Sequence, residues 1–250
     1  MKEKEIIIDI WRTDAHSVEI GIKKKDEFRA KSRQFTADTD IIGEISGDME
    51  GYVTYRQSPW ESDDLEQRLV LKIFTKSINW KGTLEELVSQ GYTRSLGSSQ
   101  MLPVFTINLS NNDFQIIIDR VFKPKSLNKE MYTFMIIEDG ISYPYRIEAD
   151  RFTLGSDWDV FNHHDNKIAK IDGSAFNMGG KWKIHINKGI TLPSSFDEVL
   201  VLFCCQLKFI ENIMDRYERV VKSLKKDEEL NIKVENDEIS LYQNPRRIRK

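Results

Sequence analysis

A helical pattern over residues 196–224 constrains the fold of this chain more than any other feature of its sequence. The first half of this segment is apolar on every side, because its hydrophobic residues follow one another almost without a break: Val199, Leu200, Val201, Leu202, Phe203, Cys204, Cys205 and Leu207. A helix that is apolar all round has to be enclosed on every side. The second half, from Ile210 onward, is amphipathic with a 3.6-residue period. The pattern therefore predicts a helix, capped by Ser194 or Ser195, that enters a closed apolar environment and then lies across a surface.

Short strand patterns separated by turn residues make up most of the chain before this helix. The Asp139-Gly140 pair is a strong hairpin signal between two of them. A short helix is expected near 83–90, because Thr83 and Glu86 have the spacing of a capping box and Gly91 follows. The strand segments are 6–11, 18–22, 41–45, 52–55, 69–74, 103–109, 114–122, 132–137, 141–147, 151–154, 158–162, 167–171 and 181–186. Strands at this spacing predict a mostly β protein, an antiparallel meander closed into a barrel around the hydrophobic helix.

The same reading divides the chain into three parts. Residues 1–40 are expected to form an N-terminal hairpin and a polar segment. Residues 41–224 are expected to form the barrel with its central helix. Residues 225–250 contain one more hairpin pattern, at 231–235 and 239–242, and a basic tail.

Charge and hydropathy narrow the classes of partner and compartment. The 37 Lys and Arg residues nearly balance the 40 Asp and Glu residues, so no nucleic-acid partner is expected. The apolar run near the N-terminus is short, is interrupted by Asp9 and lacks a cleavage site, unlike a secretory signal. No stretch approaches the roughly 20 apolar residues that cross a bilayer. We expect a soluble protein of the cytoplasm, where two adjacent cysteines stay reduced.

Candidate catalytic and metal-binding residues are few, and each has a simpler structural interpretation. His163 and His164, beside Asp165, are more typical of a polar turn than of a zinc site, because adjacent residues point apart. Cys204 and Cys205 are more typical of helix core than of a redox pair. The sequence contains neither of the glycine-rich phosphate-loop patterns, Gly-x-Gly-x-x-Gly and Gly-x-x-x-x-Gly-Lys-Ser/Thr. We therefore predict no catalytic residue, cofactor or metal, and a non-enzymatic role.

Two stretches of the sequence resemble the tubby-like superfamily, in its phospholipid scramblase and LURP-one-related branch. Residues 151–171 begin RFTLGSDWDV and end NKIAKI, similar to that branch's strand-turn-strand pattern, and 189–205 resemble its entry into the central helix. The resemblance covers roughly 132–224 and implies a barrel around a helix. The family's acidic calcium segment is absent here, since 185–190 read HINKGI, and the upstream cysteine cluster is also absent. No phosphoinositide-binding motif of Lys and Arg is recognisable on the barrel, so the resemblance implies the fold better than an activity.

The C-terminal tail is the remaining functional signal. Arg246, Arg247, Arg249 and Lys250 supply four cations, each worth about 1 kcal/mol near an anionic membrane. Our leading interpretation is a cytoplasmic binding or scaffold protein, peripheral at the membrane, that contacts phospholipid through this tail. The alternative is a protein-interaction module without a lipid role, either an assembly subunit or an immunity-type inhibitor.

Overall fold

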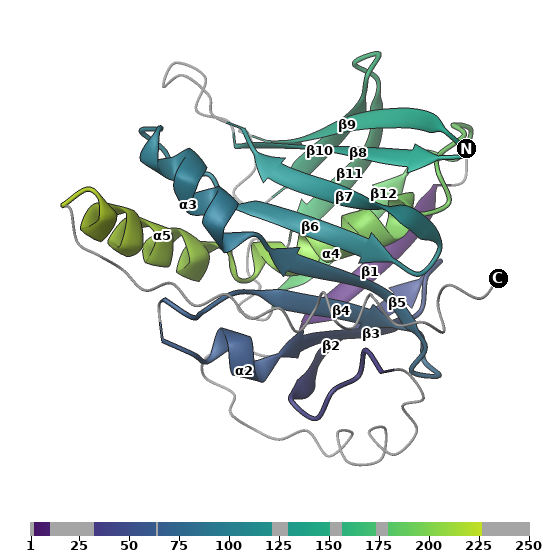
Figure 1. Cartoon of the computed structure of the whole chain (residues 1–250). Coiled ribbons are helices and arrows are strands. Elements are labelled where there is room, and N and C mark those ends of the chain that lie inside the picture. The colour runs from purple at the N-terminus through teal and green to yellow at the C-terminus, as the bar shows by residue number, and fades with distance from the viewer. Residues whose placement is uncertain are drawn as a thin grey trace.

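The computed structural model describes residues 3–10, 33–63, 65–121, 130–150, 157–173 and 180–226, and it contains a closed antiparallel barrel (Figure 1). Each strand pairs with its neighbours in sequence, and β1 closes the barrel between β2 and β12. The expected mostly β fold, a closed meander with a C-terminal helix, is confirmed. The strands are β1 (Lys4–Ile10), β2 (Thr39–Gly47), β3 (Gly51–Arg56), β4 (Val70–Phe74), β5 (Trp80–Glu86), β6 (Val104–Leu109), β7 (Asn112–Arg120), β8 (Met131–Glu138), β9 (Ile141–Ala149), β10 (Trp158–Asn162), β11 (Lys167–Gly173) and β12 (Lys181–Ile186).

Alternation of side chains decides which face of each strand points inward. In β1, Ile6, Ile8 and Ile10 are buried while the residues between them are partly exposed, as expected for a strand with one face on a core. The β8–β9 hairpin turns at Asp139 and Gly140, whose φ angles of 51° and 76° are both positive. Positive φ at both central residues is the geometry of a type I′ turn, so the predicted Asp-Gly hairpin is confirmed.

Four helices complete the described structure: α2 (Gln57–Trp60), α3 (Val88–Leu96), α4 (Phe196–Leu207) and α5 (Ile210–Leu224). Figure 1 shows α4 running inside the barrel, with α3 and α5 together at one end, which we call the closed end. The helix expected over 196–224 is interrupted at Lys208 and Phe209, so its enclosed half is α4 and its amphipathic half is α5.

The short helix expected near 83–90 begins at Val88 instead. Thr83 and Glu86, which we interpreted as a capping box, lie in β5, and Leu87 precedes α3 without a side-chain cap. The Thr83 hydroxyl accepts a hydrogen bond from Trp80 Nε1 at 2.9 Å instead of capping a helix. Pairing of β5 with both β4 and β6 outweighs the local capping signal, because it satisfies the backbone groups of the whole segment.

The N-terminal strand belongs to the barrel. We assigned residues 1–40 to a separate hairpin, but Ile8 lies opposite Trp182 of β12 on one side and Ile45 of β2 on the other. The barrel therefore begins at Lys4, and the expected boundary at residue 41 falls inside β2. The expected strands at 18–22 and 151–154 and the C-terminal hairpin at 231–242 lie outside the described residues.

Candidate functional site

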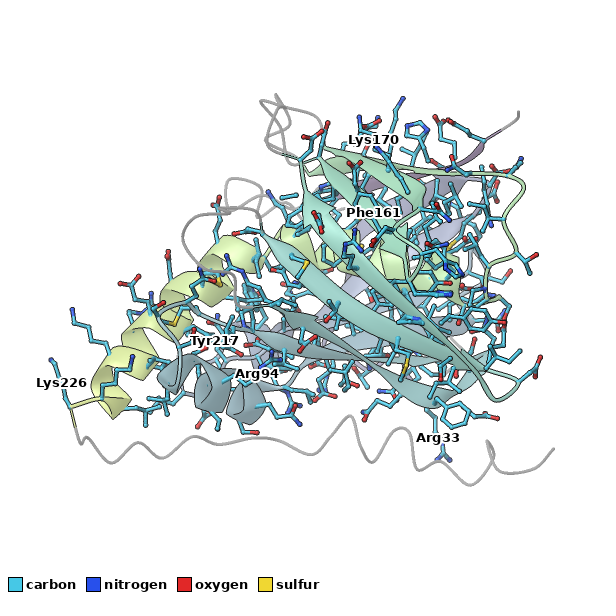
Figure 2. The ribbon with its side chains drawn as sticks, turned by 90° about the horizontal axis from the view of Figure 1, so that it is seen from above. Arg33, Arg94, Phe161, Lys170, Tyr217 and Lys226 are labelled. Atoms are coloured by element: carbon cyan, nitrogen blue, oxygen red, sulfur yellow. The ribbon has the colours of Figure 1, made fainter. Side chains whose placement is uncertain are left out.

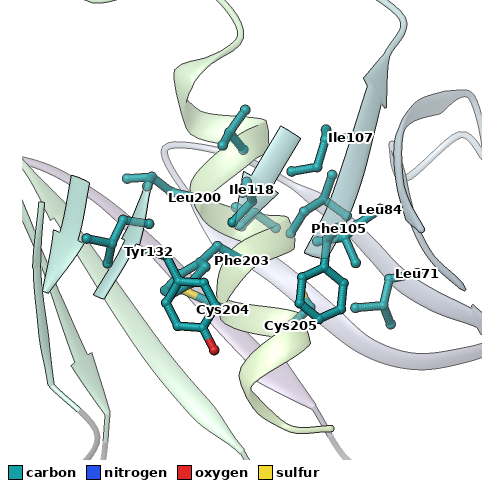
Figure 3. Close-up of a cluster of buried hydrophobic side chains, with 14 of the residues drawn as sticks. Leu71, Leu84, Phe105, Ile107, Ile118, Tyr132, Leu200, Phe203, Cys204 and Cys205 are labelled. Carbon is teal, nitrogen blue, oxygen red and sulfur yellow. The ribbon is translucent and has the colours of Figure 1, made fainter. Parts of the chain in front are cut away.

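The interior of the barrel is filled by α4. Figure 3 shows Phe203 and Cys204 facing Tyr132 on one side, while Leu71, Leu84 and Phe105 lie on the other. The Phe203 ring centroid is 5.2 Å from that of Tyr132 and 5.5 Å from that of Trp158. Of the residues that we assigned to the helix core, Val199, Val201, Leu202, Phe203, Cys204 and Cys205 are fully buried and Leu207 is partly buried. The protein's own helix thus occupies the space in which a barrel of this kind could hold a ligand.

The two cysteines are enclosed with the rest of α4. Burial raises the pKa of the Cys204 thiol well above its ordinary value, and the neighbouring Cys205 raises it further. Burial also raises the pKa of Cys205. Both thiols are therefore protonated at neutral pH, which makes them poor nucleophiles.

A buried ion pair lies at the closed end. Arg216 of α5 donates from Nη2 to Glu86 Oε1 and from Nη1 to the carbonyl of Gln67. Glu86 Oε2 accepts the backbone N–H of Leu69 at 3.0 Å. Burial by itself lowers the pKa of Arg216, but the charge and hydrogen bond of Glu86, together with the nearby Tyr92 and Tyr217, outweigh burial and the net shift is upward. These contacts attach α5 to β5, so the pair has a structural role.

Sequence reasoning missed this pair, although one signal was available. Arg216 lies among Ile213, Tyr217 and Val220, on the side of α5 that is buried. An arginine on the apolar side of a helix needs a buried partner, because an unpaired charge there is costly. Glu86 could not be identified as that partner while it was interpreted as a helix cap.

Large hydrophobic side chains are exposed at the opposite end of the barrel. Phe114, Ile141 and Ile190 are 51%, 55% and 39% exposed, and we call them the apolar rim. The three residues come from three segments that hydrogen bonds hold together at this end. Asn112, just before Phe114, donates from Nδ2 to the Ile137 carbonyl at 3.2 Å. The N–H of Ser194, shortly after Ile190, donates at 3.0 Å to Glu138, which lies just before Ile141.

The same end contains the N-terminus of α4, where two carboxylates pair with lysines. Asp197 forms an ion pair with Lys4, and Glu198 lies 3.7 Å from Lys81 Nζ. Burial raises the pKa of Glu198. The rim therefore lies close to charges that are already paired.

A second exposed apolar area lies on the outer face of β7, β8 and β9. Ile117 and Met135 are 38% and 45% exposed, and Pro144 is also exposed. Met135 lies opposite Pro144, and Ile118 lies opposite Phe134, so the same register places Ile117 beside Met135. The side chains around them, Gln115, Ile137 and Ser142, carry no charge. We call Gln115, Ile117, Met135, Ile137, Ser142 and Pro144 the uncharged patch.

The outer face of β1, β11 and β12 carries a shallow depression of about 620 Å³, lined by Lys170, Asp172 and His185 among others. His185 Nε2 lies 3.2 Å from Asp172 Oδ2, and its Nδ1 lies 3.8 Å from carboxylate oxygens of Glu3 and Glu5. These partners of His185 could not be predicted from the sequence, because they come from other parts of the barrel. Among the described residues, no group of three or more His, Cys, Asp or Glu side chains is arranged to hold a metal ion.

The remaining predicted residues are placed as follows. Arg246, Arg247, Arg249 and Lys250 lie outside the described residues. His163 and His164 lie in the exposed β10–β11 turn with ring centroids 3.8 Å apart, which agrees with the polar-turn interpretation.

The amphipathic helix α5 has its apolar side turned inward. Ile213, Tyr217, Val220 and Val221 are buried, and Figure 2 shows Tyr217 on α5 near α3 and Arg94. The apolar side of α5 is thus covered by the protein itself. No helix in the described ranges is long and apolar enough to cross a bilayer.

Comparison of the chain with protein-family models, curated proteins and solved structures finds no match.

Proposed function

We propose that this protein is a non-enzymatic binding or scaffold protein of tubby-like fold that contacts anionic phospholipid at the membrane surface. The observation that supports this most is the apolar rim, where Phe114, Ile141 and Ile190 are exposed at one end of the barrel. Exposed large hydrophobic side chains gathered in one area typically mark an interaction site. Because α4 fills the barrel, the outer surface is where a partner would bind.

Two attractions act together in this proposal. The rim side chains would enter the interfacial layer of a bilayer, where each exposed half of a Phe or Ile side chain contributes on the order of 1 kcal/mol. Lys188, exposed two residues before Ile190, and the four cations of 246–250 add electrostatic attraction. Asp113 and Asp139 are also exposed near this end, and their negative charges are repelled by an anionic membrane, so binding should be reversible. Salt screens the attraction of the cations and should weaken binding.

Vesicle flotation tests the proposal. The full chain is mixed with phosphatidylcholine vesicles containing about a third phosphatidylserine, at low salt, and the floating fraction is measured. We expect the wild type to float, and Phe114→Ser combined with Ile190→Ser, or deletion of 246–250, to lower the floating fraction several-fold. Met135→Ser is the matched control, because it removes an equally exposed apolar side chain outside the rim. Failure of the wild type to float would overturn the proposal.

The uncharged patch supports a second candidate, a protein-interaction module. An exposed apolar area without charges attracts a protein surface more readily than a lipid headgroup or a polyanion, which both need cations. The assembly subunit and the immunity-type inhibitor both belong to this class.

A further inference from the structure

Lys81 of β5 places a cation beside the apolar rim. Its backbone carbonyl accepts the N–H of Ser110 at 2.8 Å, and Ser110 lies in the β6–β7 turn that leads to Phe114. The Lys81 side chain is 40% exposed. A cation at this level would lie close to the phospholipid headgroups when the rim side chains enter the interfacial layer.

A β-bulge sets the direction of the Lys81 side chain. Ile73 of β4 pairs with Gly82, and the next residue, Phe74, pairs with Trp80, so Lys81 is the extra residue that β4 skips. A bulge bends its strand and re-aims a side chain, and bulges are common at the rims of barrels. The bulge thus explains how a residue of the barrel wall reaches a carboxylate on the enclosed helix.

That carboxylate belongs to Glu198, in the first turn of α4. Lys81 Nζ lies 3.7 Å from Glu198 Oε1, which is close enough for an ion pair but longer than a hydrogen bond. Lys4, by contrast, donates directly to Asp197 of the same turn. Lys81 is therefore a loosely held cation, while the Glu198 side chain beside it is almost completely buried.

We propose that Lys81 is the residue of the rim that binds a phospholipid phosphate, and that Glu198 withholds it until Glu198 is protonated. This inference rests on the proposed function and adds to it a headgroup contact and control by pH. A proton taken from solvent neutralises Glu198 and leaves the positive charge of Lys81 without its counterion. The ammonium, on its flexible four-carbon stem, is then free to pair with a phosphate oxygen at the membrane surface.

The surroundings of Glu198 favour this protonation. Burial raises the pKa of Glu198, and the charge of Asp197 adds to the rise. A backbone hydrogen bond and the charges of Lys81 and Lys4 lower the pKa, but the net shift is upward. The strands β4 and β12, which also pack against α4, turn apolar side chains towards it. Glu198 therefore takes up its proton at a higher pH than an exposed glutamate does.

Vesicle flotation at two pH values tests the proposal. The full chain is mixed, at pH ~7.5 and at pH ~5, with phosphatidylcholine vesicles containing about a third phosphatidylglycerol, whose only charge is on its phosphate. The salt concentration is about 0.1 M, at which charges are screened beyond ~10 Å. The partition coefficient of the wild type should rise several-fold at the lower pH. Glu198→Gln should bind about fivefold more tightly than wild type at the higher pH, since a freed lysine near an anionic surface is worth about 1 kcal/mol. Its partition coefficient should change less between the two pH values than that of the wild type.

Asp9→Asn is the matched control for Glu198→Gln. It breaks the pair between Asp9 and Lys181, which spans the same 3.7 Å, and it changes the net charge by the same amount. Asp9 lies at the other end of β1 from Lys4, towards the closed end, so its lysine is released far from the rim. Asp9→Asn should leave the partition coefficient close to that of the wild type. Equal partition coefficients for Glu198→Gln and Asp9→Asn at the higher pH would overturn the proposal.

Lys81→Gln tests the cation itself, at an exposed position where the fold is easily kept. It should remove most of the rise in binding at the lower pH. Glu198→Gln combined with Lys81→Gln should bind no more tightly than Lys81→Gln alone, and a double variant that keeps the fivefold gain would overturn the role of Lys81. A wild type that floats equally at both pH values, with no gain in Glu198→Gln, overturns this inference and leaves the proposed function standing. A chain that floats at neither pH, and also fails to float at low salt, overturns both.

Discussion

Arg216 and Glu86 form an ion pair in which neither side chain reaches solvent, and this pair joins α5 to the closed end of the barrel. The two residues lie 130 positions apart in the chain. Around them, Tyr92 of α3 and Tyr217 of α5 pack with ring centroids 4.6 Å apart. The last helix in the described part of the chain, α5, is thus attached to the barrel by an ion pair from which water is excluded.

Removing one member of this pair should cost far more than removing both. Glu86→Gln leaves the Arg216 charge buried without its counterion, so we expect the free energy of unfolding to fall by about 3–5 kcal/mol. Glu86→Leu combined with Arg216→Met should cost clearly less than the sum of the two single changes, as urea unfolding followed by circular dichroism will measure. Glu44→Gln, which breaks the exposed pair with Lys76, is the control and should cost less than about 1 kcal/mol. Equal losses for Glu86→Gln and Glu44→Gln would contradict the structural role assigned to the buried pair.

The contact between α3 and α5 depends on the absence of a side chain at Gly91. A Cβ added there would lie 2.1 Å from the Tyr217 hydroxyl oxygen and 2.7 Å from two ring carbons. Alanine is otherwise favoured over glycine in a helix by about 1 kcal/mol. We nevertheless expect Gly91→Ala to destabilise the protein by about 1–3 kcal/mol, since overpacking outweighs propensity. Gly97→Ala, at the end of the same helix with nothing nearer than 3.9 Å, should be neutral or stabilising in thermal unfolding. Tolerance of Gly91→Ala would mean that α5 packs less closely than described.

Acid should weaken the ion pair between Asp38, which lies just before β2, and Arg56 of β3. Asp38 accepts from Arg56 Nε at 3.0 Å and forms an ion pair with Nη2 at 2.8 Å. Burial raises the pKa of Asp38, but the hydrogen bonds from Arg56, Thr36 and Ser58 and the charge of Arg56 together outweigh burial and lower the pKa from its ordinary 3.8 to about 2. A carboxyl whose folded pKa is depressed stabilises the fold fully above its unfolded pKa and loses this contribution as pH falls through the folded pKa.

The expected consequence is a pH-dependent effect of Asp38→Asn. With solvent screening allowed for, the variant should be about 1–2 kcal/mol less stable than wild type above pH ~4. This difference should narrow as pH falls from ~4 towards ~2. Urea unfolding of both proteins across this range measures it, and a difference that is constant with pH would show that the ion pair contributes nothing.

The barrel could be predicted from the sequence because the signals for its strands and for its turns are both local in the chain. Alternating apolar residues mark each strand, as in Lys181–Ile186, and pairs such as Asp139-Gly140 mark the turns. A meander needs little else, since each strand pairs with the next one along the chain. The enclosed helix was predictable for the same reason, because no surface position accepts a segment such as Val199–Cys205.

What the sequence could not predict depends on contacts between distant residues. Thr83 and Glu86 satisfy a local helix rule, but β5 is held by two neighbouring strands and Glu86 is needed by Arg216. The uncharged patch was equally hidden, because Ile117, Met135 and Pro144 become neighbours only through strand register. From the sequence alone, each of these apolar residues would be assigned to the core, and only the fold shows that its side chain lies on the outer face of its strand.

The enclosure of α4 makes Leu202 a sharp test of the fold. Leu202 is fully buried and its Cδ1 lies 3.4 Å from where a Cβ on Gly82 of β5 would be. Leu202→Ala leaves a cavity inside the barrel and should lower the free energy of unfolding by about 2–5 kcal/mol in urea. Leu202→Asp places an unpaired charge there and should abolish cooperative folding, measured as loss of the near-ultraviolet circular dichroism signal. Leu96→Asp, at a half-exposed position on α3, should change stability by less than about 1 kcal/mol. A soluble Leu202→Asp variant that unfolds cooperatively would contradict the placement of α4 inside the barrel.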